Sequence, residues 1–328
     1  MKSKLINFIR WPAFVSLVLL VSLLIINQIL SPGYLNKAYI TNFLGSNGPL
    51  IMSSIGLSIV LISGGMDISV GGIMSLINVV YITLSESGMQ TILILVICIL
   101  VGLFCGIING LFVGYLRITP ILTTFATSSL FSGIALWIMP SPRGSVPKGL
   151  LNWYYSWLGG FGAPILFLLI IVIGWFIIRK SKLGIMLYAV GANKENSYLS
   201  GINVYRVQFI SYVLAALFYT ISAISMTTYF SGGDATVASA LTMKAITACV
   251  IGGVLLSGGV GDGIGAAFGA TSLGLAITTV LAIVKNAFFQ DFASGVLMLI
   301  AVIGCTLLNR YIANKFSKKG VVINAEKD

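Results

Sequence analysis

The chain has 328 residues, of which 58% are hydrophobic and only 8% are charged. Water-soluble domains carry about 25% charged residues, so this composition excludes an ordinary soluble protein and indicates an integral membrane protein. The formal net charge is +11, but the basic residues are scattered at the ends of apolar runs and form no aromatic-interleaved patch. Nucleic acid is therefore not expected as a partner.

Apolar runs long enough to cross a bilayer recur along the chain. Each span needs about 20 apolar residues, which predicts an all-α polytopic fold with about ten transmembrane helices. No room is left for a sizeable soluble domain, so residues 1–328 are expected to form a single membrane domain. The first run lacks a cleavage site and is read as an uncleaved helix. The expected spans are 11–30, 49–65, 68–84, 90–116, 118–139, 164–179, 207–229, 241–256, 264–283 and 292–312.

The distribution of basic residues predicts the orientation. With both termini in the cytoplasm, 14 basic residues lie on the cytoplasmic side, including Arg117, Arg179 and Lys194, and only 4 lie outside: Lys37, Arg143, Lys148 and Lys285. Lys244 falls near the outer end of a span. This asymmetry satisfies the positive-inside rule.

The segment Gly64 to Gly72 places a carboxylate, Asp67, and four glycines between two apolar runs. A charge and non-helical backbone are costly in lipid, so this segment should face protein, a cavity or the interface. Asp67 has two alternative roles: it caps the helix that begins near Ile68, or it contacts a solute. The pattern Ser-Gly-Gly followed by Asp occurs again at Ser257 to Asp262, and both copies read either as tight turns or as broken helices lining a polar pathway.

Two glycine ladders predict close helix packing. One holds Gly102, Gly106, Gly110 and Gly114 on a single helical face, and the other holds Gly261, Gly265 and Gly269. Small-residue ridges let neighbouring backbones approach in membrane bundles. They indicate a bundle without specifying a function.

Two connections outside the spans carry further signals. The outer segment 141–163 holds several aromatic residues, which favours an interfacial belt over a sugar-stacking platform. Residues 36–42 read as a short interfacial helix.

In the cytoplasmic connection, about 180–206, Asn193 caps a helix over Lys194 to Ser200 that Gly201 ends. So short a helix needs a partner surface, which is either the protein's own face or another subunit.

Nothing in the sequence indicates catalysis. Histidine is absent, the four cysteines lie inside apolar runs without metal-ligand spacing, and no Gly-Lys dipeptide occurs for a phosphate-binding loop. We expect a protein that is not an enzyme, with no cofactor and no metal site.

Four motifs in order resemble the ribose-type carbohydrate ABC transporter permeases, over about residues 50 to 310. They are Gly65-Met66-Asp67-Ile68-Ser69-Val70-Gly71, Asn109-Gly110 through Leu116-Arg117-Ile118-Thr119-Pro120 with Thr123-Thr124, the stretch Gly184 to Val204, and Ala245 to Gly259. The chain departs from that family's pattern at Thr242 and Lys244, where an acidic pair is common, and at Gly261-Asp262.

The resemblance implies a sugar importer subunit in the bacterial cytoplasmic membrane, surrounded by membrane lipid. Its implied partners are an ABC ATPase, an extracytoplasmic solute-binding protein and a second permease protomer, identical or different. The stretch 180–206 then becomes the coupling loop that docks on the ATPase, through Gly191, Asn193, Lys194, Glu195, Ser200 and Gly201.

The solute route should be lined or braced by polar residues of the glycine-broken segments, because a sugar loses many water hydrogen bonds on entering a membrane. The candidates are Asp67, Ser69, Asn78, Asn109, Thr123 and Thr124. The main alternative function is an ion-coupled secondary transporter of a small polar solute, with Asp67 as the ion carrier. A scaffold or channel subunit is a further alternative.

Overall fold

The computed structural model describes residues 13–30, 33, 35–160, 162–284 and the isolated positions 292, 295–296, 299 and 303–304. Every regular element in these parts is a helix, so the expected all-α class is confirmed. The elements are α2 (Phe14–Leu30), α3 (Lys37–Ile62), α4 (Val70–Glu86), α5 (Thr91–Gly110), the π-helix η1 (Leu111–Tyr115), α6 (Pro120–Ile138), α7 (Lys148–Gly160), α8 (Pro164–Lys180), α9 (Lys182–Ala192), α10 (Lys194–Leu199), α11 (Val204–Phe230), α12 (Leu241–Ile251) and α13 (Gly263–Val284).

Five helices in the described residues are long and apolar enough to cross a membrane: α3, α5 with η1, α6, α11 and α13. A sixth span arises if α8 and α9, which are bent by 74° at their junction, count as one. Three apolar helices, α2, α4 and α12, are shorter. The expected tenth span, 292–312, lies almost entirely outside the described residues.

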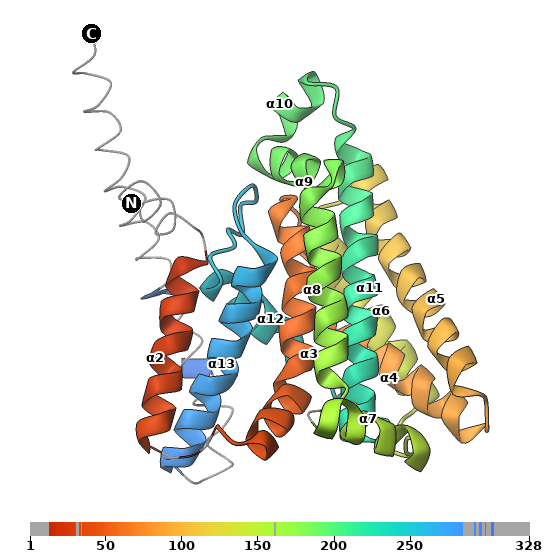
Figure 1. Cartoon of the computed structure of the whole chain (residues 1–328). Helices are drawn as coiled ribbons and strands as arrows, with labels where there is room; N and C mark the ends of the chain where they lie inside the picture. The colour runs from red at the N-terminus through yellow and green to blue at the C-terminus, as the bar shows by residue number, and fades with distance from the viewer. Residues whose placement is uncertain are drawn as a thin grey trace.

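Helices α3 and α11 form the centre of the bundle (Figure 1), and α11 packs on α3, α4, α5 and α8. The predicted glycine ridge of α5 faces α11. A Cβ at Gly106 would lie 2.7 Å from the Ala216 side chain, and one at Gly110 would lie 2.8 Å from the Phe209 carbonyl oxygen. Because these helices approach backbone to backbone, the packing role predicted for the ridge is confirmed.

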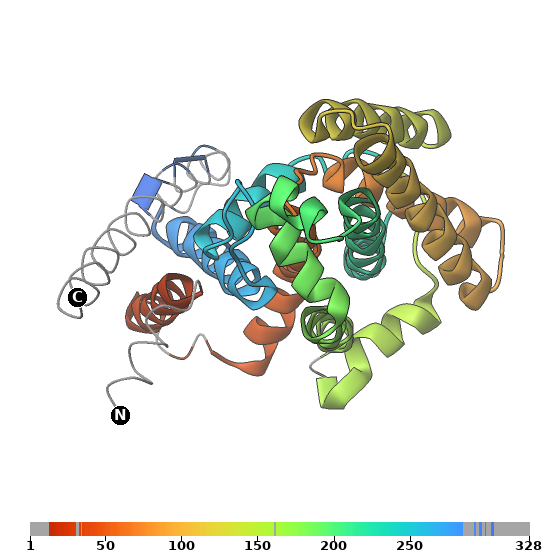
Figure 2. The same cartoon turned by 90° about the horizontal axis from the view of Figure 1, so that it is seen from above.

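On the other side of α3, α13 packs against α12, α3 and α2. In Figure 2 these helices occupy one half of the molecule and α5 and α6 the other. The second glycine ladder packs here, since a Cβ at Gly269 would lie 2.8 Å from the Gly252 nitrogen.

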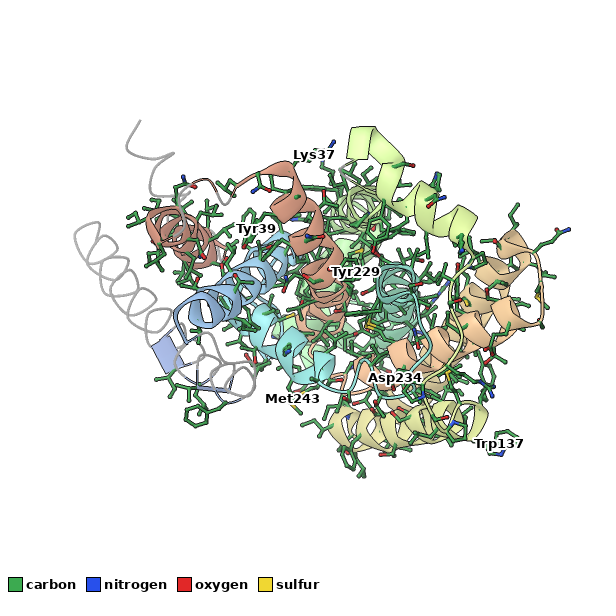
Figure 3. All side chains as sticks on the ribbon, turned by 90° about the horizontal axis from the view of Figure 1, so that it is seen from below. Lys37, Tyr39, Trp137, Tyr229, Asp234 and Met243 are labelled. Carbon is green, nitrogen blue, oxygen red and sulfur yellow. The ribbon has the colours of Figure 1, made fainter. Side chains whose placement is uncertain are left out.

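The two ends of the bundle differ. At one end, called here the loop end, α9 and α10 extend beyond the spans (Figure 1). At the opposite end, α7 lies across the bundle beside the ends of α3 and α11, and Figure 3 shows Lys37, Tyr229 and Asp234 on this face.

The structure corrects several expected boundaries. Residues 37–42 are the first turns of α3, which runs on through Pro49, because the Asn36 side chain accepts the Tyr39 amide and starts the helix there. Residues 141–163, expected outside, contain α7, and residues 180–206, expected on the cytoplasmic side, contain α9 besides the short helix. Helix α12 ends at Ile251, five residues before the expected 256, since Gly252 and Gly253 follow and Gly253 has a φ of +78°.

Candidate functional site

Between α3 and α4 the chain leaves helical geometry inside the bundle. The break begins at Ser63 and the left-handed Gly64, with a φ of +75°, and ends where α4 starts at Val70. Ser63, Asp67 and Ser69 are at most 1% exposed. Broken backbone at this depth requires hydrogen-bond partners supplied by the protein.

Asp67 bonds to the start of α4. Its Oδ1 accepts the Ser69 amide at 2.8 Å and the Ser69 hydroxyl at 2.6 Å. Ser69 is the N-cap residue of α4 and has no side-chain cap hydrogen bond, so Asp67 bonds to the residue just before the helix instead of occupying the N-cap position itself. A carboxylate at this end of a helix also interacts favourably with the helix dipole.

Hydrogen bonds between side chains link Ser69 to residues of α5 and α6. The Asn109 Nδ2 donates to Ser69 Oγ at 2.8 Å, and the Thr127 hydroxyl donates to Asn109 Oδ1 at 2.6 Å. All three residues are buried. Buried polar groups that satisfy one another in this way fix the relative positions of the elements that carry them, here α4, α5 and α6.

The backbone of the break is bonded by side chains from three other helices. Thr124 of α6 accepts the Ile68 amide at 3.0 Å, and Tyr212 of α11 donates to the Met66 carbonyl at 2.9 Å. Thr242 of α12 donates to the Ile68 carbonyl at 3.3 Å and accepts the Gly71 amide, in the first turn of α4, at 2.9 Å. The non-helical segment is therefore held by α6, α11 and α12 together.

Two candidate pathway residues lie apart from this group. Asn78, in α4, donates to Thr227 Oγ1 and to the Gly232 carbonyl, and it accepts the Asp234 amide at 2.8 Å. It therefore fastens the connection after α11. Thr123 is 5% exposed, and its hydroxyl has no hydrogen-bond partner among the described residues.

The two Ser-Gly-Gly turns meet at the loop end. Gly259, in the second turn, donates its amide to the Ile62 carbonyl, at the end of α3, at 2.9 Å. A Cβ at Gly258 would lie 2.7 Å from the Gly64 Cα. The tertiary structure thus joins two sequence patterns that are almost 200 residues apart.

Asp262 repeats the geometry of Asp67 in the second turn. It accepts the amide two residues ahead, that of Ile264, at 3.1 Å at the start of α13. It also accepts Trp175 Nε1 at 3.1 Å and pairs with Arg179 at 2.7 Å. Together with the Tyr188 hydroxyl, which donates to the Gly261 carbonyl at 2.8 Å, these bonds tie α8 and α9 to the second turn.

Residues 180–206, predicted to be the coupling loop, are mostly helical. The expected helix after Asn193 is confirmed as α10, and it ends one residue earlier than predicted. The Asn193 side chain accepts the Asn196 amide at 2.9 Å, and Gly201 has a φ of +80°. Glu195 lies in the first turn and Ser200 is the C-cap residue.

Gly191, at the end of α9, lies between the two turns. A Cβ there would lie 2.5 Å from the Gly259 nitrogen and closer still to the Ile62 carbonyl oxygen. Only glycine fits such an approach. At Gly191, residues 180–206 therefore touch the end of α3 and the α12–α13 turn through backbone atoms. We call the meeting of Gly64, Gly191, Gly258 and Gly259 the glycine junction.

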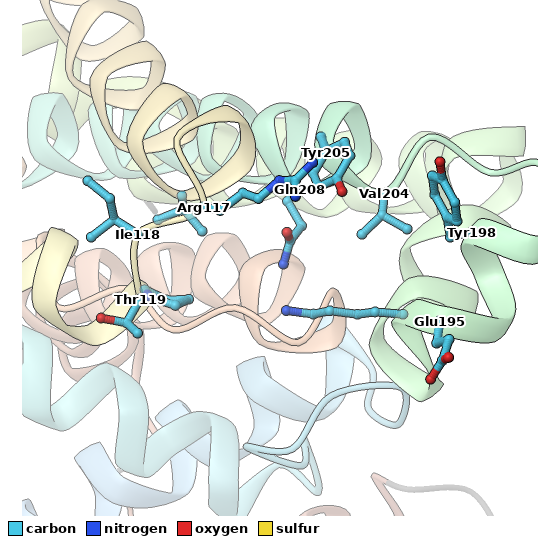
Figure 4. A pocket seen from close by; sticks show the side chains of 11 residues that line it. Arg117, Ile118, Thr119, Glu195, Tyr198, Val204, Tyr205 and Gln208 are labelled. Atoms are coloured by element: carbon cyan, nitrogen blue, oxygen red, sulfur yellow. The ribbon is translucent and has the colours of Figure 1, made fainter.

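A cavity of about 500 Å³ lies beside α10 at the loop end. Figure 4 shows Arg117 and Thr119 from the η1–α6 turn on one side, Glu195 and Tyr198 on the other, and Gln208 of α11 between them. The cavity is also lined by Lys194, whose pKa is lowered by burial. Arg117 lies over the Tyr205 ring at 4.3 Å, and its backbone has a φ of +57°.

Several residues of these sites were not predicted from the sequence. Thr127, Tyr212 and Gln208 were not singled out, and Thr242 was noted only as a departure from a family pattern. Asp262 was noted in the second Ser-Gly-Gly turn, without its link to α8. Thr127 could have been found because it lies one helical turn from Thr123 and Thr124 on α6. The role of Asp262 at the start of α13 could have been found from its spacing to the next helix, which matches that of Asp67.

The fold and these sites define a polytopic helical membrane protein with broken helices and a folded loop at one end. Residues 39–302 match the family described as branched-chain amino acid transport system / permease component. The similar proteins include "Probable ABC transporter permease protein y4mJ" of Sinorhizobium fredii, 36% identical over 80% of this chain and 79% of that one. "Ribose import permease protein RbsC" of Bacillus subtilis is 30% identical over 86% and 88%.

A third relative is "Autoinducer 2 import system permease protein LsrD" of Photorhabdus luminescens, 30% identical over 76% of this chain and 77% of that one. No solved structure matches the chain. The family match covers most of the chain, and the chain belongs to this family of transporter permeases. The resemblance to ribose-type ABC permeases is confirmed, and the members of this family are transporter components rather than enzymes.

Proposed function

We propose that the chain is the membrane-spanning subunit of an ABC importer that translocates a simple sugar or a related carbohydrate. The observation that carries this proposal is the glycine junction in a member of a permease family: a folded loop contacts both broken segments through backbone atoms. The names of similar proteins, which include ribose and autoinducer 2 import permeases, support a carbohydrate-like solute.

In this proposal, the chain has about ten spans in a single domain, with both termini in the cytoplasm of a bacterium and the loop end on the cytoplasmic side. It pairs with a second permease protomer, and a solute-binding protein delivers the sugar at the α7 end. An ABC ATPase docks on α10, whose Tyr198 and Leu199 are exposed.

Transmission follows from the contacts at the loop end. When the ATPase closes, it moves α10 and α9, and Gly191 passes this displacement to the end of α3 and to the second turn, because no side chain lies between them to absorb it. The hydrogen-bonded side chains of Asp67, Ser69, Asn109 and Thr127 then move with α3 and α4. Asp67, Ser69, Asn109 and Thr124 act as braces of the broken segment next to the solute route, and Asn78 and Thr123 complete the polar set.

Purification followed by reconstitution tests the function. A tagged permease is isolated from its host in mild detergent, its partners are identified by mass spectrometry, and the complex is placed in liposomes with the binding protein outside and ATP inside. We expect sugar uptake that requires ATP and the binding protein. Uptake driven by a proton or sodium gradient without any ATPase would refute the proposal in favour of the secondary transporter.

A further inference from the structure

The cavity beside α10 contains a buried donor without a matching acceptor. Gln208 is 6% exposed, and its side-chain nitrogen has no hydrogen-bond partner among the described residues. Leaving a buried donor without a partner is costly, so such a group marks a site where a bound species accepts its hydrogen bond. In Figure 4, the Gln208 amide points into the open space between Arg117 and α10.

Two cations line the same space. Arg117 comes from the η1–α6 turn, and Lys194 comes from α10 and reaches toward the first turn, where its Cε would lie 3.7 Å from a Cβ at Gly64. The carboxylate of Glu195, the acidic residue of the lining, points away from Gln208 in Figure 4. The lining therefore carries two cations and one carboxylate from separate segments, and a bound anion would supply the acceptor that the Gln208 nitrogen lacks.

The surroundings of Arg117 indicate where that anion comes from. The side chains of Leu116, Ile121 and Leu122 are 55–63% exposed on the outside of the same turn. Apolar side chains beside a basic cavity at the end of a span suit the acyl chains and headgroup of a phospholipid. Arginine and lysine together also suit phosphate oxygens better than they suit neutral ligands.

We propose that the cavity lined by Arg117, Lys194 and Gln208 binds a phosphate group, either the headgroup of an anionic phospholipid in the adjoining leaflet or a free phosphate ester. The adjoining leaflet is the cytoplasmic one in the orientation proposed above, and this part of the inference rests on that proposed function. Occupancy would hold the η1–α6 turn against α10. The position of α10 would then depend on whether an anionic lipid or a soluble phosphate compound is bound.

The test is binding to the detergent-purified full chain, followed by native mass spectrometry and thermal unfolding. One arm titrates phosphatidylglycerol against phosphatidylcholine with the same acyl chains, and the other titrates inorganic phosphate and glucose 6-phosphate. The variants are Gln208→Glu, which keeps the shape and removes the donor, and Arg117→Gln. The matched control is Arg206→Gln, an exposed cation outside the cavity lining.

We expect selective binding of phosphatidylglycerol, weakened about tenfold or more in both variants and unchanged in the control, because each variant removes a hydrogen bond to a charged group. The same pattern with the soluble compounds would assign a free phosphate ester as the source. Binding that falls equally in Arg206→Gln would reduce the effect to overall charge and overturn the site. The site would also be overturned if no phosphate compound bound while attachment of the partner ATPase depended on Arg117 and Gln208. That result would indicate that a carboxylate of the ATPase occupies the cavity.

This experiment contains neither sugar nor ATP. A failure here would leave the importer assignment standing, and a failure of ATP-driven uptake would leave the anion site standing.

Discussion

Gly259 donates its backbone amide to the carbonyl of Ile62 at 2.9 Å, and this single bond joins the end of α3 to the turn before α13. Gly191 of α9 lies against both residues. Because the three segments meet through backbone atoms, a small displacement of the coupling loop must be transmitted to the others or must break the contact. The predictions below test this arrangement and the polar contacts around it.

Replacing Gly191 with Ala should abolish sugar uptake while the purified complex still hydrolyses ATP. A Cβ would lie 2.5 Å from the Gly259 nitrogen, so α9 must move away from the junction. The matched control is Gly133→Ala in α6, where a Cβ meets nothing within 4 Å. The control should be neutral or stabilising by about 0.5–1 kcal/mol, because alanine favours helix. Uptake in liposomes and ATPase rates measure both; normal uptake by Gly191→Ala would contradict the transmission route.

Replacing Gly201 with Val should uncouple transport by unfolding the end of α10. Its φ of +80° strains any β-branched side chain, although the space around it is open. The cost should be about 1–2 kcal/mol, enough to fray a helix of one and a half turns. Gly201→Asn tolerates this backbone conformation and should retain most uptake. If the well-expressed Val variant transports normally, α10 does not need its left-handed cap for coupling.

Substitutions at Asp67 should separate capping from a role of its charge. Asp67→Ala leaves the Ser69 amide and hydroxyl without their acceptor, which should destabilise the protein by about 1–3 kcal/mol. Asp67→Asn keeps an acceptor oxygen and should retain folding and most uptake. Thermal unfolding in detergent and uptake in liposomes measure the two effects. Loss of uptake in the Asn variant with unchanged stability would show that the charge itself serves transport.

The pair of Arg179 and Asp262 should contribute to the attachment of α8 to the second turn. Arg179→Gln removes the ion pair from the buried Asp262 carboxylate but keeps its hydrogen bonds from Trp175 and Ile264. Because the arginine is partly exposed, we expect a coupling energy of about 1–2 kcal/mol in a double-mutant cycle with Asp262→Asn. Unfolding midpoints of the two single variants and the double variant give this energy. Strictly additive losses would show that the pair contributes nothing beyond its separate bonds.

Single-cysteine labelling should place the loop end in the cytoplasm. On a cysteine-free background, Leu199→Cys in α10 should react with an impermeant maleimide only in inside-out vesicles, and Lys148→Cys at the start of α7 should react in intact cells. Both positions are exposed in the structure. The reverse pattern would invert the proposed topology and move the ATPase to the other end.

The local features of the chain were predictable because the residues that produce them are close in sequence. The all-α class, the helix over Lys194–Leu199 with its Asn193 cap, and the packing of the α5 glycine ridge all follow from periodicity, caps and small-residue spacing within one or two turns. The boundaries that were wrong depended on local signals that also fit other structures. Ser181 is both the C-cap of α8 and the N-cap of α9, so the sequence did not separate α9 from a loop. The Asn36 cap starts α3 itself, whereas residues 36–42 looked like a separate short helix.

The partners of the polar side chains were decided by tertiary structure. Asp67, Ser69 and Asn109 could be named as polar residues in apolar runs, but their connection through Ser69 to Thr127 depends on how α4, α5 and α6 pack. The meeting of Gly64, Gly191 and Gly259 depends in the same way on three chain segments spread over almost 200 residues. A sequence specifies which groups must be satisfied in a membrane, because lipid offers no hydrogen bonds; only the packed bundle decides which distant group satisfies each one.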